Sequence, residues 1–289
     1  MVANSPSAVG HAESKLGELV AVRDTIELSG GVVSRPVGCV GRCLVAVGPM
    51  TKSSVLSVSL RSSAGLAVVV RDWADVSVDE LQAAAPWRTF RWRHGQKHFS
   101  GAYWSSTQRD VVIYESRLEL ARLLFADFEP SVIGIVAQPF LLQTEVKAKQ
   151  RRHIPDYLFV TNQGPVVVDV KPQRRLADPT TVSTFEWTRA AVQSRGWGYE
   201  VASEPPKMEL ENVRFLAGYR RDWLFDNELL DDLRAIDLVG ATLGDAFGCL
   251  PRRRPALVRS AVLHLLWRQE FGIDLTKPLN AHAELKGRG

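Results

Sequence analysis

Two runs of sequence decide the fold of this chain: His153-Ile-Pro-Asp156-Tyr-Leu-Phe-Val160 and Val166-Val-Val-Asp169-Val-Lys171. Apolar, branched and aromatic residues fill both runs, and Thr161-Asn-Gln-Gly-Pro165 between them has the composition of a turn. The pattern therefore predicts two adjacent strands with charged residues at their ends. Because side chains two residues apart in a strand share a face, Asp169 and Lys171 are expected to point the same way.

Charged side chains at the ends of a nearly apolar hairpin are costly to bury unless a partner neutralises them. The carboxylates of Asp156 and Asp169 can hold a divalent metal through oxygen ligands, and the Lys171 ammonium can neutralise negative charge that develops nearby. A hairpin that ends in a simple salt bridge is the alternative. Pro155-Asp156, the short spacer and a hydrophobic strand ending in Asp-x-Lys are together more typical of a P-D…(D/E)-x-K nuclease site.

The clearest helix is predicted for residues 114–128, where apolar residues recur at three- and four-residue steps and Pro130 follows. Glu115 and Glu119 are four residues apart and share one face beside the apolar stripe. A glutamate on this helix can complete the shell of a metal held by the hairpin. An ordinary charged helix flank is the alternative.

The order of predicted elements indicates an α/β core with a mixed sheet: a helix, three strands, the Asp-x-Lys strand, a helix and a strand. Residues 1–20 are polar and expected to be disordered, and 21–95 form a small β-rich N-terminal region. The nuclease core spans 96–204. Residues 205–289 are helical and resemble a winged helix weakly, and a plain helical protein-binding domain fits nearly as well.

The composition is that of a soluble globular protein, with 45% hydrophobic and 24% charged residues. No run of about 18 apolar residues is present, so no membrane contact is expected. A signal peptide is not apparent, and Cys39, Cys43 and Cys249 cannot make a disulfide framework. These features lead us to expect a cytoplasmic protein.

The basic residues gather in places that suit a polyanionic partner. The net charge is only +4, but two of three basic clusters flank the proposed metal site. We expect phosphate contacts from Arg151, Arg152, Arg174 and Arg175, with a solvated surface as the alternative. The stretch from Trp87 to Trp104 interleaves aromatics with Arg, Lys and His, which suits either nucleic-acid stacking or an ordinary core edge.

The chain resembles the TnsA family, the endonuclease subunits of heteromeric transposases. The resemblance is carried by five motifs: Tyr114-Glu-Ser-Arg-Leu-Glu119, Glu129-Pro-Ser-Val132, Gln138-Pro139, Pro155-Asp156 and Val168-Asp-Val-Lys171. It covers about residues 96–201 and extends loosely to the helical tail. It implies a restriction-endonuclease-like core and Mg²⁺-dependent DNA cleavage at transposon ends, with Mn²⁺ as a substitute. The implied partners are a DDE transposase subunit and an AAA+ ATPase regulator.

The resemblance also implies a set of site residues. The catalytic set is Glu119, Asp156, Asp169 and Lys171, with Glu115 as the alternative helix acid. The metal ligands are the three acids and the backbone carbonyl of Val170. Two other functions stay open: a stand-alone restriction- or repair-type nuclease, and a non-catalytic assembly subunit that binds DNA or a transposase.

Overall fold

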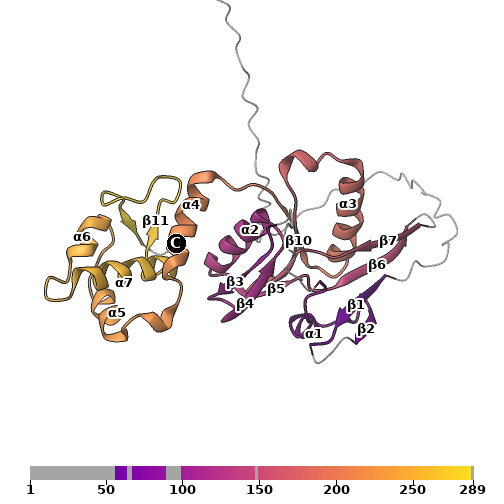
Figure 1. Cartoon of the computed structure of the whole chain (residues 1–289), viewed down its shortest axis with the longest axis horizontal. Helices are drawn as coiled ribbons and strands as arrows, with labels where there is room; N and C mark the ends of the chain where they lie inside the picture. The colour runs from indigo at the N-terminus through magenta and orange to yellow at the C-terminus, as the bar shows by residue number, and fades with distance from the viewer. Residues whose placement is uncertain (1–55, 64–66, 89–98, 147–148, 288–289) are drawn as a thin grey trace, which may run out of the picture. The chain divides into compact units, whose positions relative to one another are not determined.

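The computed structural model describes residues 56–63, 67–88, 99–146 and 149–287 (Figure 1). The predicted hairpin is confirmed: β8 (Tyr157–Thr161) pairs antiparallel with β9 (Gly164–Val170). Gly164 has a φ of 119°, a conformation that L side chains rarely adopt, so the tight turn between the strands requires glycine there. The disorder expected for residues 1–20 concerns a part of the chain outside the described residues.

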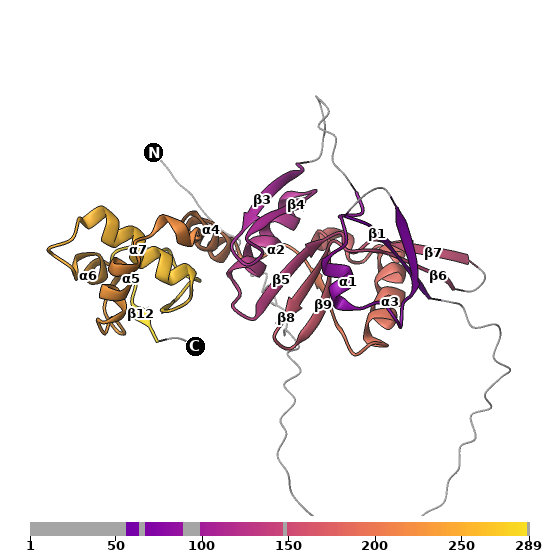
Figure 2. The same ribbon diagram turned by 90° about the horizontal axis from the view of Figure 1, so that it is seen from below.

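Two further strands extend the hairpin into a sheet with the order β10-β9-β8-β5. Strand β5 (Val132–Ala137) pairs antiparallel with β8, and β10 (Gly198–Ala202) pairs parallel with β9. Figure 2 shows β5, β8 and β9 side by side. The sheet is therefore mixed, and the predicted α/β class is confirmed.

Helices α2 (Arg117–Phe128) and α3 (Pro179–Gln193) pack on opposite faces of this sheet (Figure 1). Residues Tyr157 and Phe159 of β8 belong to the same buried cluster as the side chains of α2. The intervening Leu158 belongs to the cluster that contains the buried side chains of α3. This alternation is the two-residue period of side chains along a strand. The charged ends of β8 and β9 therefore lie between the layer of α2 and the layer of α3.

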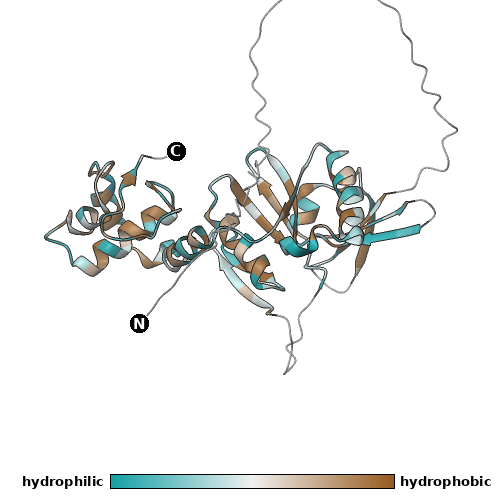
Figure 3. Ribbon diagram, turned by 90° about the horizontal axis from the view of Figure 1, so that it is seen from above, coloured by the Kyte–Doolittle hydropathy of each residue, from teal (hydrophilic) through white to brown (hydrophobic). Residues whose placement is uncertain are grey.

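A second sheet has the order β2-β1-β6-β7. It joins β1 (Ser57–Arg61) and β2 (Val68–Asp72) to β6 (Leu141–Val146) and β7 (Lys149–His153). Strands from the expected N-terminal region 21–95 therefore share a sheet with strands of the expected core. The sequence pattern does not predict β7, because Lys-Gln-Arg-Arg-His has no apolar alternation; Figure 3 shows it as a hydrophilic strand.

Helix α2 begins three residues later than the apolar period predicts. The hydroxyl of Ser116 accepts a hydrogen bond from the backbone N–H of Glu119 and caps the helix. Tyr114, which carries the expected start of the stripe, instead ends β4 (Asp110–Tyr114), which pairs with β3 (Gly101–Ser105). Cross-strand pairing thus replaces the helical period at this position.

The C-terminal part is mainly helical, as predicted. A short 3₁₀ segment at Asp222–Leu224 precedes the second helix of this part, and a two-stranded sheet follows its last helix. The elements are α4 (Lys207–Leu216), α5 (Asn227–Arg234), α6 (Leu243–Gly248), α7 (Pro255–Trp267), β11 (Gly272–Ile273) and β12 (Leu285–Lys286). The winged-helix assignment stays a prediction.

The C-terminal helices share one buried cluster with α2 and the main sheet. The ring of Trp267 lies 5.2 Å from that of Phe128 between centroids, and its indole N–H donates to Ser106 Oγ at 3.1 Å. Gln269 donates to the backbone carbonyl of Phe128 at 2.6 Å. Among the described residues, no helix is long and apolar enough to cross a membrane.

Asp127 holds the β3–β4 hairpin against α2. It is 6% exposed and accepts four hydrogen bonds of 2.6–3.0 Å, from the Tyr103 and Ser105 hydroxyls and from the backbone N–H groups of Ser106 and Thr107. Because four donors converge on one buried carboxylate, its loss leaves several of them without an acceptor.

We expect Asp127→Ala to lower the free energy of unfolding by about 3 kcal/mol, since buried donors lose a charged acceptor. Urea unfolding measures the change. Asp110→Ala is the matched control, because Asp110 is exposed on the same hairpin and, among the described residues, accepts only from the adjacent Val111 N–H. Equal stability of the two variants would contradict the role assigned to Asp127.

Candidate active site

One cavity of about 860 Å³ collects the residues predicted to be catalytic. It lies at the ends of β8 and β9 and is closed on one side by the start of α2. Its lining contains the predicted acids, lysine and backbone ligand, namely Glu115, Glu119, Asp156, Asp169, Val170 and Lys171. Residues that are up to 56 positions apart in the sequence therefore face one space.

Asp156 and Lys171 are positioned by the backbone of two strands. The N–H of Val170 donates to Asp156 Oδ2 at 2.6 Å, which fixes this carboxylate to the end of β9. The backbone N–H of Lys171 donates to the carbonyl of Ala202 at 2.9 Å, so the residue continues the pairing of β9 with β10. In the described part of the chain, the Lys171 ammonium makes no ion pair within 4 Å, which leaves it available to a ligand.

Asp169 is 2% exposed and both of its carboxylate oxygens are engaged. Oδ1 lies 2.8 Å from His153 Nε2, and Oδ2 accepts a hydrogen bond from the Tyr199 hydroxyl. Tyr199 lies on β10 and His153 ends β7, so both sheets contribute to holding this acid. Burial and the charge of Asp169 raise the pKa of Tyr199 above its ordinary value, because both disfavour the phenolate.

The two helix glutamates occupy different environments. Glu119 accepts hydrogen bonds from the Glu115 N–H at 2.6 Å and from the Ser116 hydroxyl at 2.9 Å, in the first turn of α2. The carboxylate of Glu115 instead pairs with the Arg88 guanidinium at 2.8 Å. Of the two, Glu119 is the acid whose charge raises the pKa of Asp156.

Burial and like charges raise the pKa of the acids in the cavity. Burial raises the pKa of Asp156 well above its usual range, and the charges of Glu119 and Asp169 raise it further. The Val170 N–H and the Lys171 ammonium act in the opposite direction. Burial likewise raises the pKa of Glu119. Because each ionised acid disfavours ionisation of its neighbours, the site favours a bound cation or bound protons.

The donor chemistry of the cavity fits a divalent cation, because hard carboxylate oxygens carry repelling charges around a space large enough for a ligand. The placement of these side chains gives a different result from their chemistry. Among the described residues, no three His, Cys, Asp or Glu side chains are arranged to hold a metal as they stand. The carboxylate oxygens of Asp169 and Glu119 instead form hydrogen bonds with protein groups.

The structure divides the four arginines expected to contact DNA. Arg152 and Arg175 line the cavity, whereas Arg151 and Arg174 do not. Arg151 and Arg152 are adjacent in β7, so their side chains point to opposite faces of the strand. The Nε of Arg151 is buried and has no hydrogen-bond partner within the part of the chain that the structure describes.

Sequence reasoning missed several residues that shape the cavity. His153 and Tyr199 hold Asp169, and Arg88 holds Glu115. Gln138 joins two of the walls: its side-chain oxygen accepts from the Arg88 N–H at 2.8 Å, and its own N–H donates to the Asp156 carbonyl at 2.8 Å. The Gln138-Pro139 motif was a signal for this link, whereas nothing in the local sequence marks Tyr199.

Asp156→Asn is expected to stabilise the protein at about pH 8 in EDTA. The pKa of Asp156 is raised in the folded state, so above about pH 4 the folded protein binds more protons than the unfolded one, and stability falls as pH rises. Asparagine does not titrate and keeps an oxygen for the Val170 N–H. Urea unfolding at about pH 5 and pH 8 should show an advantage that grows with pH.

Asp178→Ala is the control, because its effect on stability should change with pH in the opposite direction. The Thr181 N–H lowers the pKa of Asp178 at the start of α3, so its removal should destabilise the protein, and less so as the solution becomes acidic. An Asp156→Asn advantage that shrinks with rising pH would contradict the raised pKa.

Comparison with known proteins identifies part of the chain. Residues 129–204 match the family described as TnsA-like endonuclease N terminal. The matched segment includes Asp156, Asp169 and Lys171, whereas Glu115 and Glu119 precede it. No curated protein matches the chain. The resemblance expected from the sequence is thus confirmed, and over residues 129–204 the chain is similar to the N-terminal domain of TnsA-like endonucleases.

Proposed function

We propose that this protein is a metal-dependent DNA endonuclease subunit of a transposase, which hydrolyses phosphodiester bonds at transposon ends together with a DDE transposase. One observation carries the proposal: four acids and one lysine, from the start of α2 and from the ends of β8 and β9, line one cavity in a chain with a TnsA-like segment. An AAA+ ATPase regulator is the further partner that the family resemblance suggests.

In this proposal Asp156, Glu119 and the carbonyl of Val170 hold Mg²⁺, or Mn²⁺ in its place. Glu119 would exchange its hydrogen bonds with the N-terminus of α2 for the cation. A bound divalent cation would supply a water of lowered pKa and stabilise charge on the phosphate. Asp169 contributes its charge to the site, and its ligation of the metal would require release from His153 or Tyr199.

Lys171 has the role of stabilising negative charge on the scissile phosphate or orienting the attacking water. Lys171 lines the cavity, and its ammonium has no ion-pair partner among the described residues, so a phosphate would not have to displace one. Arg152 and Arg175 line the same cavity and would contact phosphates of the bound strand. Arg151 and Arg174 would contact DNA only beyond the cavity.

A non-catalytic assembly subunit is the second candidate. It is favoured by the protein hydrogen bonds that occupy Asp169 and Glu119, because such bonds stabilise the acids without a metal. The two candidates differ in Mn²⁺ binding, which calorimetry measures directly. A stand-alone nuclease differs from both, because it would cut DNA without a transposase.

Asp156→Ala and Lys171→Ala are expected to abolish nicking of DNA that carries transposon ends, assayed with the transposase and Mg²⁺ present. Loss of a metal ligand or of the charge-stabilising lysine should lower the rate by at least about a hundredfold. Asp110→Ala, on an exposed strand end away from the cavity, serves as control. Nicking at the normal rate by either cavity variant would reject the assignment.

Substitution of the helix acids should separate Glu119 from Glu115. Glu119→Gln is expected to weaken Mn²⁺ binding, measured by calorimetry without DNA, because its charge acts on Asp156. Glu115→Gln should bind Mn²⁺ as the normal protein does, since its carboxylate is paired with Arg88. The reverse result would move the ligand assignment to Glu115.

A further inference from the structure

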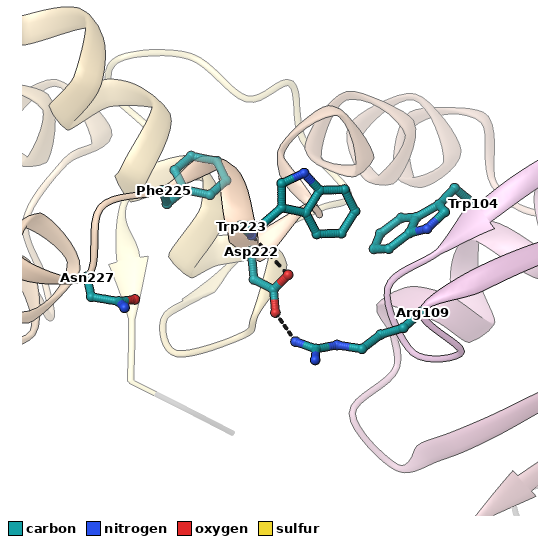
Figure 4. A pocket seen from close by; sticks show the side chains of 6 residues that line it. All are labelled: Trp104, Arg109, Asp222, Trp223, Phe225 and Asn227. Carbon is teal, nitrogen blue, oxygen red and sulfur yellow. Dashed lines mark hydrogen bonds and ion pairs between the residues drawn. The ribbon is translucent and has the colours of Figure 1, made fainter.

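A second cavity, of about 630 Å³, is built from aromatic and polar side chains outside the active site. It is lined by Trp104, Arg109, Asp222, Trp223, Phe225 and Asn227 (Figure 4). Arg109 lies in the β3–β4 turn, and Trp223 lies in the 3₁₀ segment that precedes α5. The cavity therefore joins the hairpin held by Asp127 to the C-terminal helices.

The aromatic wall is exposed and held in place. Trp223 is 59% exposed, and its ring meets that of Trp104 edge to face at 4.5 Å between centroids. The Arg220 guanidinium donates to the Trp104 carbonyl at 2.7 Å, which anchors the strand end that carries this ring. A large exposed ring with a fixed neighbour offers a ready stacking surface.

Positive charge surrounds these rings. The Arg221 guanidinium lies 5.7 Å from the centre of the Trp104 ring, and Arg220 lies 5.8 Å from it. Arg109 pairs with Asp222 through one nitrogen, and its side chain remains 71% exposed. Since a guanidinium has five N–H donors, Arg109 can bind an anion while keeping that pair.

The chemistry of the cavity selects the class of ligand. The charged lining residues, Arg109 and Asp222, pair with each other. Arg220 and Arg221 beside the Trp104 ring add positive charge, which disfavours a cationic ligand although aromatic rings alone would attract one. An apolar side chain would leave Arg109 and the amide of Asn227 unused, and Asn227 makes no side-chain hydrogen bond within the described residues. A planar ligand with polar edges and a negative charge uses the rings, the amide and the guanidinium together.

We propose that this cavity binds an unpaired nucleotide of a DNA strand. The base stacks on Trp223, the Asn227 amide contacts the edge of the base, and Arg109 contacts a phosphate. A base inside a duplex cannot present its face to an indole, so the ligand is single-stranded or flipped out. The proposal deepens the proposed nuclease function, since it names a second point at which the cut DNA is held.

The two cavities lie toward opposite ends of α2. Glu119 is in the first turn of the helix, and Asp127 near its end binds the turn that carries Arg109. Twelve residues at 1.5 Å each make the helix about 18 Å long. At the duplex rise of about 3.4 Å per nucleotide, the length of this helix corresponds to roughly five nucleotides of one strand.

The test measures binding of a labelled mixed-sequence oligonucleotide by fluorescence anisotropy, as a single strand and as a duplex, in EDTA so that no cleavage occurs. Trp223→Ala should weaken single-strand binding about tenfold and leave duplex binding unchanged, because one stacked base is lost. Trp223→Phe keeps an aromatic face and should restore most of the affinity. Arg109→Gln should lower the salt dependence of single-strand binding by about 0.7 in slope, the value for one phosphate contact.

Phe215→Ala is the matched control, because Phe215 is an exposed aromatic residue on α4 that does not line the cavity. Unchanged single-strand binding by Trp223→Ala would overturn the proposal and leave the cavity to a protein contact. Equal weakening for single strand and duplex would overturn it as well. A protein that never nicks DNA but loses single-strand affinity on Trp223→Ala would refute the nuclease function and support this site.

Discussion

The structure depends on holding three carboxylates, the buried Asp169 and the partly buried Glu119 and Asp156, at one end of a hydrophobic hairpin. Burial raises the pKa of Asp156, and neighbouring acids raise it further, so each ionised group must be compensated by a donor. The donors come from the Val170 backbone, from Ser116 at the start of α2 and from Tyr199 on β10. The acid cluster thus determines where a helix and two strands must end, and a nuclease site needs such a cluster.

Local sequence predicted the elements whose cause is local. The β8–β9 hairpin follows from two apolar runs and a turn, and α3 ends at Gln193, with Ser194 as its C-cap, shortly before Gly196, whose φ is 70°. The errors arose where pairing with a neighbouring strand, rather than the residue pattern of the segment itself, decides the structure. Strand β7 is polar throughout and is a strand because β6 pairs with it, and Tyr114 is in a strand because β3 does the same.

The residues of the candidate site were predictable where they stand close together in the sequence. Asp156, Asp169 and Lys171 stand in one short motif, and they do share a cavity. The partners of Asp169 were not predictable, because His153 lies 16 residues before it and Tyr199 lies 30 residues after it. The separation of Glu119 from Glu115 also depended on long-range structure, since Arg88 binds one of them from a segment 27 residues upstream.

The shared core of α2 and α7 has a consequence for any attempt to shorten the protein. Glu204-Pro-Pro206 looks like a natural place to divide the chain. However, Trp267, which lies beyond that point in the sequence, packs on Phe128, and its indole N–H donates to Ser106 Oγ. A fragment ending there would expose the face of α2 that supports the hairpin and present it to other chains. The α/β core and the helical tail share one buried cluster, so we expect them to fold as one unit rather than as interchangeable modules.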